Sequence, residues 1–153
     1  MGLKTAIGSD HRGYAMKEAI KMTLESLGVS VNDKGAYSDE SVDYPEFARK
    51  VAKSISECEC DRGILICGSG IGMAITANKF PGVRAALCHD LNTAKMSRLH
   101  NDANVLVLGE IVGLELAREM LTVWMKTQFE GGRHQKRLDL IRSIENNNFK
   151  ETV

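Results

Sequence analysis

The sequence predicts an α/β fold in which one parallel sheet of five strands carries helices on both faces. Short apolar runs of strand length alternate with amphipathic stretches of helical length throughout the 153 residues. The alternation occurs five times, which is typical of parallel strands joined by helical crossovers. Because such crossovers are right-handed, the expected result is a doubly wound, Rossmann-like domain.

Each element is assigned from its local pattern. Strands are predicted where short runs are rich in aliphatic residues, at 4–9 (KTAIGS), 29–33 (VSVND), 63–67 (GILIC), 84–88 (RAALC) and 105–109 (VLVLG). Helices are predicted at 13–27, 45–57, 71–79, 91–99, 112–128 and 134–147. Asp10 could serve as the N-cap of the first helix, and Pro45 suits the first turn of the second. We expect a single domain over residues 1–147 and a frayed tail over 148–153.

Composition and charge argue against several classes of function. Lys plus Arg equals Asp plus Glu at 20 each, so no overall field attracts nucleic acid or an anionic membrane surface. No apolar run approaches the roughly 20 residues needed to span a bilayer. The four cysteines lack the spacing of a zinc site or of a C-x-x-C redox pair. We therefore expect a protein with reduced thiols in the cytoplasm, without a metal.

Polar and reactive side chains follow three of the predicted strands. In open α/β sheets the ligand sits outside the carboxyl ends of the strands. Those ends carry Ser9-Asp10-His11, Cys67-Gly68-Ser69-Gly70 and Cys88-His89-Asp90. The sequence therefore predicts a site at this edge of the sheet.

The turn GSGIG at 68–72 lies between a predicted strand and a predicted helix. Its backbone N–H groups, aided by the helix N-terminus, suit an anion. The spacing is G-x-G-x-G after the third strand, not the G-x-G-x-x-G after the first strand that binds dinucleotides. A tight turn without a ligand is the alternative.

Cys67 has four interpretations. A phosphatase loop would need an arginine six positions further on, where Met73 stands, and a redox pair would need C-x-x-C. A general base fits, because a helix N-terminus favours a thiolate and the neighbouring turn can hold an oxyanion. That layout suits enolisation next to a carbonyl. A buried structural cysteine is the alternative.

A second group of polar residues is predicted at the amino edge of the sheet. His100 and Asn101 precede the fifth strand, and Arg133 and Arg137 begin the last helix. A five-residue strand spans about 17 Å, so these side chains lie far from Cys67 of their own chain. Cations near a helix N-terminus are disfavoured, and a nearby anion would account for them. Either they are solvated surface residues, or a partner subunit brings its carboxyl edge to them across a two-fold interface.

Taken in order, the motifs resemble those of the ribose/galactose isomerase family, and among them the type B ribose-5-phosphate isomerases. The motifs are GSDHRGY (8–14), DYPEFA (43–48), ICGSGIG (66–72), ANKFPGVRAALC (77–88), SRLHNDANVLVLGE (97–110) and EGGRHQKR (130–137). The resemblance implies an aldose–ketose isomerase of the pentose phosphate pathway that uses no cofactor. It also implies a homodimer with shared active sites, alone or paired into a tetramer, in which the last helix reaches the partner.

The resemblance also implies roles for residues that match the motifs. Cys67 would carry the proton between C1 and C2 of the sugar through an enediolate, and Ser69 would move the proton between O1 and O2. His100 of the partner would open the furanose ring. The enediolate oxygens would be held by backbone N–H groups of Gly68, Gly70, Ile71 and Gly72.

Further residues would bind the substrate on the same grounds. Asp10 and Tyr44 would contact sugar hydroxyls. His11, Arg133 and Arg137 would hold the phosphate, with Asn101 helping nearby.

Two positions depart from the family's pattern. Ser69 stands where threonine is usual, and the stretch from Gly109 to Gly113 lacks the phosphate-binding arginine of the common G-x-R-x-x-G. Arg12, where a small residue is commoner, could compensate. The alternatives are therefore an isomerase of allose 6-phosphate, galactose 6-phosphate or erythrulose 4-phosphate, or a non-catalytic phosphate- or nucleotide-binding module. The GGRH segment favours the pentose enzyme over the galactose 6-phosphate enzymes.

Overall fold

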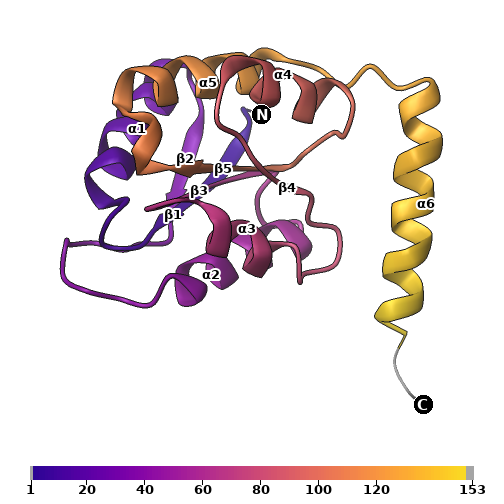
Figure 1. Cartoon of the computed structure of the whole chain (residues 1–153), viewed down its shortest axis with the longest axis horizontal. Helices are drawn as coiled ribbons and strands as arrows, with labels where there is room; N and C mark the ends of the chain where they lie inside the picture. Colours follow the sequence, from indigo (N-terminus) through magenta and orange to yellow (C-terminus); the bar gives the residue numbers. More distant parts are fainter. Residues whose placement is uncertain (1, 151–153) are drawn as a thin grey trace.

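The central element is a five-stranded sheet whose strands are all parallel (Figure 1). A computed structural model describes residues 2–150. The sheet order is β2-β1-β3-β5-β4. The strands are β1 (Lys4–Ser9), β2 (Ser30–Asp33), β3 (Arg62–Cys67), β4 (Ala85–Leu87) and β5 (Val105–Gly109). The predicted doubly wound α/β fold is therefore confirmed.

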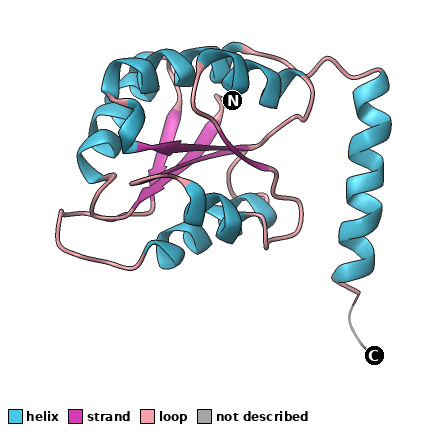
Figure 2. Cartoon of the chain, viewed as in Figure 1, coloured by secondary structure: helices cyan, strands magenta, loops and turns pink. Residues whose placement is uncertain are grey.

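Helices cover both faces of this sheet, and one helix stands apart (Figure 2). One layer holds α1 (Tyr14–Ser26), α4 (Leu91–Leu99) and α5 (Leu114–Lys126), and the other holds α2 (Tyr44–Ser56) and α3 (Ile71–Ala77). The short 3-10 helix η1 (Glu110–Val112) follows β5. The last helix, α6 (Arg133–Asn148), projects beside the sheet at the β4 side. Among residues 2–150, none of the helices is both long enough and apolar enough to cross a membrane.

The alternation of side chains along β3 divides the core into two layers. Ile64 and Ile66 pack with α1 and α5, where Trp124 is fully buried. Leu65 and Cys67 face the opposite layer, formed by α2 and α3. Since successive residues of a strand point to opposite faces, a central strand flanked by helices must be apolar on both sides. Cys67 therefore lies at the α2–α3 face of the sheet.

Element boundaries differ from the predictions by small amounts that have local causes. Helix α3 ends at Ala77 rather than at 79, because the Asn78 side chain turns toward β4. Its amide donates to Ala85 O at 2.9 Å and accepts from Ala85 N at 2.9 Å. At the other end of the chain α6 closes at Asn148, while 151–153 of the predicted tail lie outside the described residues.

A buried ion pair ties α1 to β2. The Lys17 side chain is fully buried, and its Nζ lies 2.7 Å from Asp33 Oδ2 and 2.9 Å from Glu18 Oε1. Lys21 Nζ reaches the same Asp33 oxygen at 2.7 Å. Burial raises the pKa of Asp33, but hydrogen bonds from Lys17 and Lys21 lower it by more, so the pKa is lowered overall. The ionised carboxylate therefore stabilises the folded protein.

We expect Asp33→Asn to lower the free energy of unfolding by about 3 kcal/mol at pH 7, because it leaves the buried Lys17 without its main counter-charge. The contribution of Asp33 is present above its unfolded pKa of about 3.9 and is lost as pH falls through the lower folded value. The difference between variant and wild type should accordingly narrow in acid. Urea denaturation at pH 7 and in acid measures this, with the exposed Asp39→Asn as control. Equal stabilities at pH 7 would contradict it.

Candidate active site

Three strand ends bring reactive groups together at the carboxyl edge of the sheet. β1 and β3 pair with Ser9 opposite Ile66, and β3 and β5 pair with Cys67 opposite Gly109. The loop after β1 stays attached to β3, because Asp10 N donates to Ile66 O at 3.2 Å. The predicted clustering is therefore present for the loops after β1 and β3. The third predicted end, Cys88-His89-Asp90, follows the edge strand β4, which β5 separates from β3, so the end of β5 takes the place expected for that of β4.

The Gly-rich turn wraps around the sulfur of Cys67. Cys67 is 5% exposed, and Gly70 N donates to its Sγ at 3.1 Å. Gly70 has φ +81°, a conformation in which glycine is strongly preferred, and the chain enters α3 from it. Ile71 N donates to Ser69 Oγ at 3.2 Å. The turn thus places a hydrogen-bond donor directly on the sulfur.

The N–H groups of this turn divide into two kinds. Those of Gly70 and Ile71 already have partners within the turn. Their predicted interaction with enediolate oxygens requires these partners to be exchanged, and it stays a prediction. Gly68 and Gly72 flank them at either end of the same turn.

Tyr44 lies against the Gly-rich turn. It opens α2 with a half-exposed side chain, and a Cβ at Gly72 would collide with its ring. Only a glycine at 72 allows this approach. The structure therefore brings Tyr44 and Cys67 to the same loop cluster, as the resemblance implied.

Asp10 and His11 are held by backbone groups. Asp10 is buried, and its Oδ1 accepts from Gly13 N at 3.0 Å. The N-cap residue of α1 is Gly13, so the prediction of Asp10 as N-cap was wrong by three residues, although its side chain does satisfy an N–H at the helix start. His11 Nδ1 accepts from Val42 N at 3.2 Å, which leaves the proton on Nε2 as a donor.

Arg12 also belongs to this edge. Its Nη2 lies 2.7 Å from Glu110 Oε1, in the turn that follows β5. The guanidinium stands over Gly68, next to Cys67.

The remaining predicted residues lie at the opposite edge. His100 follows the last residue of α4, which starts after the carboxyl end of β4 and runs back toward the amino edge. Its ring stacks on His134 with 4.2 Å between centroids and 15° between planes. Arg133 begins α6, and Arg137 lies exposed one turn further on. Asn101 follows His100, and its backbone O accepts from Arg84 Nε at 3.2 Å.

One chain therefore does not bring its two groups of residues together. Asp10, His11, Tyr44, Cys67 and Ser69 lie at the carboxyl edge, whereas His100, Asn101, Arg133 and Arg137 lie at the amino edge. This division is the one that the order of elements predicts.

His134 was missed by the reasoning from sequence. It is 4% exposed, and its Nε2 lies 3.4 Å from Glu130 Oε2, while His100 Nε2 lies 3.9 Å from the same oxygen. The signal was available, because His134 directly follows Arg133 in the GGRH segment. It is buried because it stacks on His100 at the start of α6.

His100, Glu130 and His134 are also the one group in the described chain with potential metal-ligating atoms close together, within 4.8 Å of one another. The two rings are stacked nearly parallel. Their in-plane lone pairs therefore lie in separate planes and do not converge on one ion. The arrangement suits a charge-coupled pair of imidazoles better than a metal centre.

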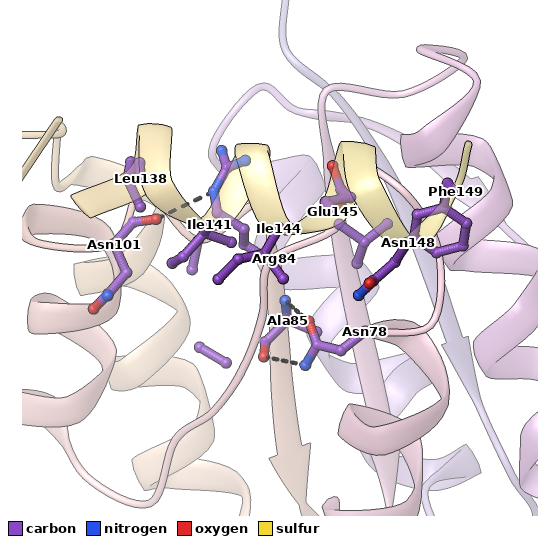
Figure 3. A pocket seen from close by; sticks show the side chains of 13 residues that line it. Asn78, Arg84, Ala85, Asn101, Leu138, Ile141, Ile144, Glu145, Asn148 and Phe149 are labelled. Atoms are coloured by element: carbon purple, nitrogen blue, oxygen red, sulfur yellow. Dashed lines mark hydrogen bonds between the residues drawn. The ribbon is translucent and has the colours of Figure 1, made fainter. Parts of the chain in front are cut away.

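A hollow of about 410 Å³ separates α6 from the edge of the sheet (Figure 3). On one side it is lined by Ala85 of β4 and by Arg84, the residue before β4. Apolar residues of α6 line the other side. Asn101 also reaches this hollow. The reasoning from sequence did not foresee it, because it arises from the projection of α6.

The chain is similar in sequence and in fold to known proteins. The family model described as ribose/galactose isomerase matches residues 5–141. Ribose-5-phosphate isomerase B of Escherichia coli (strain K12) is 49% identical over 143 residues, which cover 93% of this chain and 96% of that protein. D-erythrulose-4-phosphate isomerase 2 of Mycolicibacterium smegmatis is 42% identical over 134 residues, covering 85% and 88%. The solved structure of Clostridium thermocellum ribose-5-phosphate isomerase B matches with a TM-score of 0.93 at 51% identity, covering 95% of this chain and 99% of that one.

We expect Glu130→Gln to lower the pKa of His134 further. Burial lowers this pKa first, and the nearby His100, Arg133 and Arg137 lower it too, whereas Glu130 raises it. Removing the negative charge of Glu130 removes the cause that favours the imidazolium. NMR titration of the His134 ring measures the change, with the exposed Glu119→Gln as control. An unchanged or higher pKa would contradict the assignment of Glu130 as the counter-charge.

Proposed function

This chain belongs to the ribose/galactose isomerase family, and we propose that it interconverts D-ribose 5-phosphate and D-ribulose 5-phosphate as a cofactor-free aldose–ketose isomerase. The observation that carries the proposal is the buried Cys67 sulfur, which accepts an N–H from the Gly-rich turn at the carboxyl edge. Relatives that match nearly the whole chain carry the name ribose-5-phosphate isomerase B. The free cysteines and the pathway of this reaction fit a cytoplasmic enzyme.

The proton transfer follows from the position of Cys67. Its thiolate takes the C2 proton of the open-chain aldose, and the electron pair moves onto O1 to form an enediolate. The thiol then returns the proton to C1, while Ser69 passes the O2 proton to O1. One proton moves between carbons and one between oxygens, so no oxidant is needed. Backbone N–H groups of the turn offset the charge on the enediolate.

Substrate binding is assigned to the groups around this turn. Asp10 and Tyr44 contact the sugar hydroxyls, and Tyr44 is well placed because its ring rests on Gly72. His11 offers its Nε2–H to the phosphate, since Nδ1 is already engaged by Val42 N.

The second half of the site comes from a second copy of the chain. His100 of the partner opens the furanose ring, and Arg133, Arg137 and Asn101 of the partner reach the phosphate. Apolar side chains on and directly after α6 support this assembly. Leu140, Ile141 and Ile144 of α6, and Phe149 directly after it, are 48–62% exposed, more than a monomer normally leaves unpaired in one place. The hollow beside α6 offers a place for the matching elements of the partner. The homodimer is the functional unit, alone or paired into a tetramer.

A second candidate is the isomerisation of another aldose or ketose phosphate. The stretch from Gly109 to Gly113 favours it, because it lacks the phosphate-binding arginine that the resemblance implies. The relative in Mycolicibacterium smegmatis carries the name D-erythrulose-4-phosphate isomerase 2. Assay of allose 6-phosphate, galactose 6-phosphate and erythrulose 4-phosphate beside ribose 5-phosphate separates the candidates.

We expect Cys67→Ala to lower kcat by roughly 10³-fold or more while substrate still binds, because a positioned base contributes about 10²–10⁴ and the turn stays in place. NMR in D₂O follows the conversion of ribose 5-phosphate and the entry of deuterium at the exchanging carbon. Cys58→Ser, at an exposed thiol, is the matched control. Full exchange by the alanine variant would contradict the role of Cys67, and binding without turnover in the wild type would favour a non-catalytic module.

We expect mixed dimers to reveal the shared site. Cys67→Ala and His100→Ala chains should each be inactive alone. A heterodimer of the two keeps one site in which both residues are intact, so a mixture refolded together should recover about a quarter of wild-type activity. Activity is measured after co-refolding, with the same chains mixed without unfolding as control. No recovery in verified heterodimers would place both residues in one chain's site.

A further inference from the structure

The Arg12 side chain lies at the carboxyl edge of the sheet, against the Gly-rich turn that follows Cys67. Its Nε and Nη2 donate to Glu110 Oε1 at 3.0 and 2.7 Å. A Cβ built on Gly68 would lie 3.3 Å from Arg12 Cζ, Nε and Nη1, so the guanidinium rests on the first glycine of the turn. Arg12 therefore links the loops after β1, β3 and β5.

The ion pair leaves much of the guanidinium unused. Both hydrogen bonds go to one carboxylate oxygen, whereas a guanidinium has five N–H donors. The side chains of Arg12 and Glu110 are 62% and 34% exposed. An exposed Arg–Glu pair contributes little stability and can be exchanged for another anion.

Arg12 is also alone as a permanent cation at this position. The loops at 10–13, 68–70 and 110–113, which follow the three central strands, contain no other lysine or arginine. The neighbouring His11 presents its Nε2 as a donor. Arg12 is therefore the one guanidinium that these loops of the same chain offer to a doubly charged phosphate, beside the arginines proposed to come from the partner, and it is held by one glutamate.

We propose that Arg12 binds the phosphate of the substrate and that Glu110 is the anion it releases when the substrate enters. The inference rests on the proposed function, because it requires a sugar phosphate as substrate. A phosphate can accept the two N–H bonds of a guanidinium on two separate oxygens, whereas Glu110 accepts both on one. The phosphate is charged throughout the reaction, whereas the enediolate is transient. Arg12 therefore acts on binding, and Glu110 lowers the affinity that Arg12 provides.

Steady-state kinetics with ribose 5-phosphate and inhibition by inorganic phosphate test this. Arg12→Ala should raise KM and the inhibition constant of phosphate together by about tenfold, the effect of losing a charge-assisted hydrogen bond, with kcat nearly unchanged. Glu110→Gln should lower both constants several-fold. In the Arg12→Ala background Glu110→Gln should have no effect, since the two side chains act as a unit. Arg49→Ala removes an exposed Arg–Glu pair on α2 and is the matched control.

Three results would overturn the proposal. One is a fall in kcat for Arg12→Ala while the inhibition constant of phosphate stays unchanged. Arg12 would then act on the reacting carbons and not on the phosphate. Another is an Arg12→Ala variant whose KM and phosphate inhibition constant equal those of the wild type. Arg12 and Glu110 would then be a surface ion pair without a role in binding. The last is that Glu110→Gln lowers KM and the phosphate inhibition constant equally in the wild type and in the Arg12→Ala variant. If the wild type does not isomerise ribose 5-phosphate, the proposed function fails, and calorimetry with inorganic phosphate still tests Arg12 by the same variants.

Discussion

The site depends on how closely the carboxyl ends of β1, β3 and β5 approach one another. A Cβ on Gly13 would lie 2.5 Å from Ile66 O, and one on Gly109 would lie 2.8 Å from Ser69 O. Glycine at these positions lets α1 and β5 close onto the end of β3. The Gly-rich turn can then fold over Cys67 and exclude water from the sulfur. A low-dielectric surrounding strengthens each N–H that faces a developing charge.

The same topology separates the two groups of candidate site residues within one chain. Because each crossover helix returns the chain to the amino edge, residues after α4 and α5 are placed there, including His100 and Arg133. No rearrangement of side chains carries them across the strand length to Cys67. If the two groups act in one site, as proposed, they must come from different copies of the chain, and α6 with the hollow beside it is the surface proposed to hold those copies together.

Reasoning from the sequence succeeded where local pattern and topology determine the answer. The strands, the helices and the carboxyl-edge cluster follow from periodicity and from the rules for parallel sheets. It failed where the outcome depends on one side chain meeting another far along the chain. The stacking of His134 on His100 and the pairing of Arg12 with Glu110 join residues 34 and 98 positions apart. The spacing of residues along the sequence does not encode such contacts. The position of α6 beside the sheet could not be predicted either, because few contacts to the rest of the chain fix it.

A partly exposed glutamate stands beside Arg12 in one group of candidate site residues and beside two imidazoles in the other. Glu110 faces Arg12 at the carboxyl edge, and Glu130 faces His100 and His134 at the amino edge. Each carboxylate is partly exposed, so its ion pairs are screened and cost little to break. A dianionic phosphate competes well against such a partner, since it brings more charge and more acceptor oxygens. The exchange proposed for Arg12 therefore costs little, because the guanidinium gives up one screened carboxylate and gains a dianionic partner.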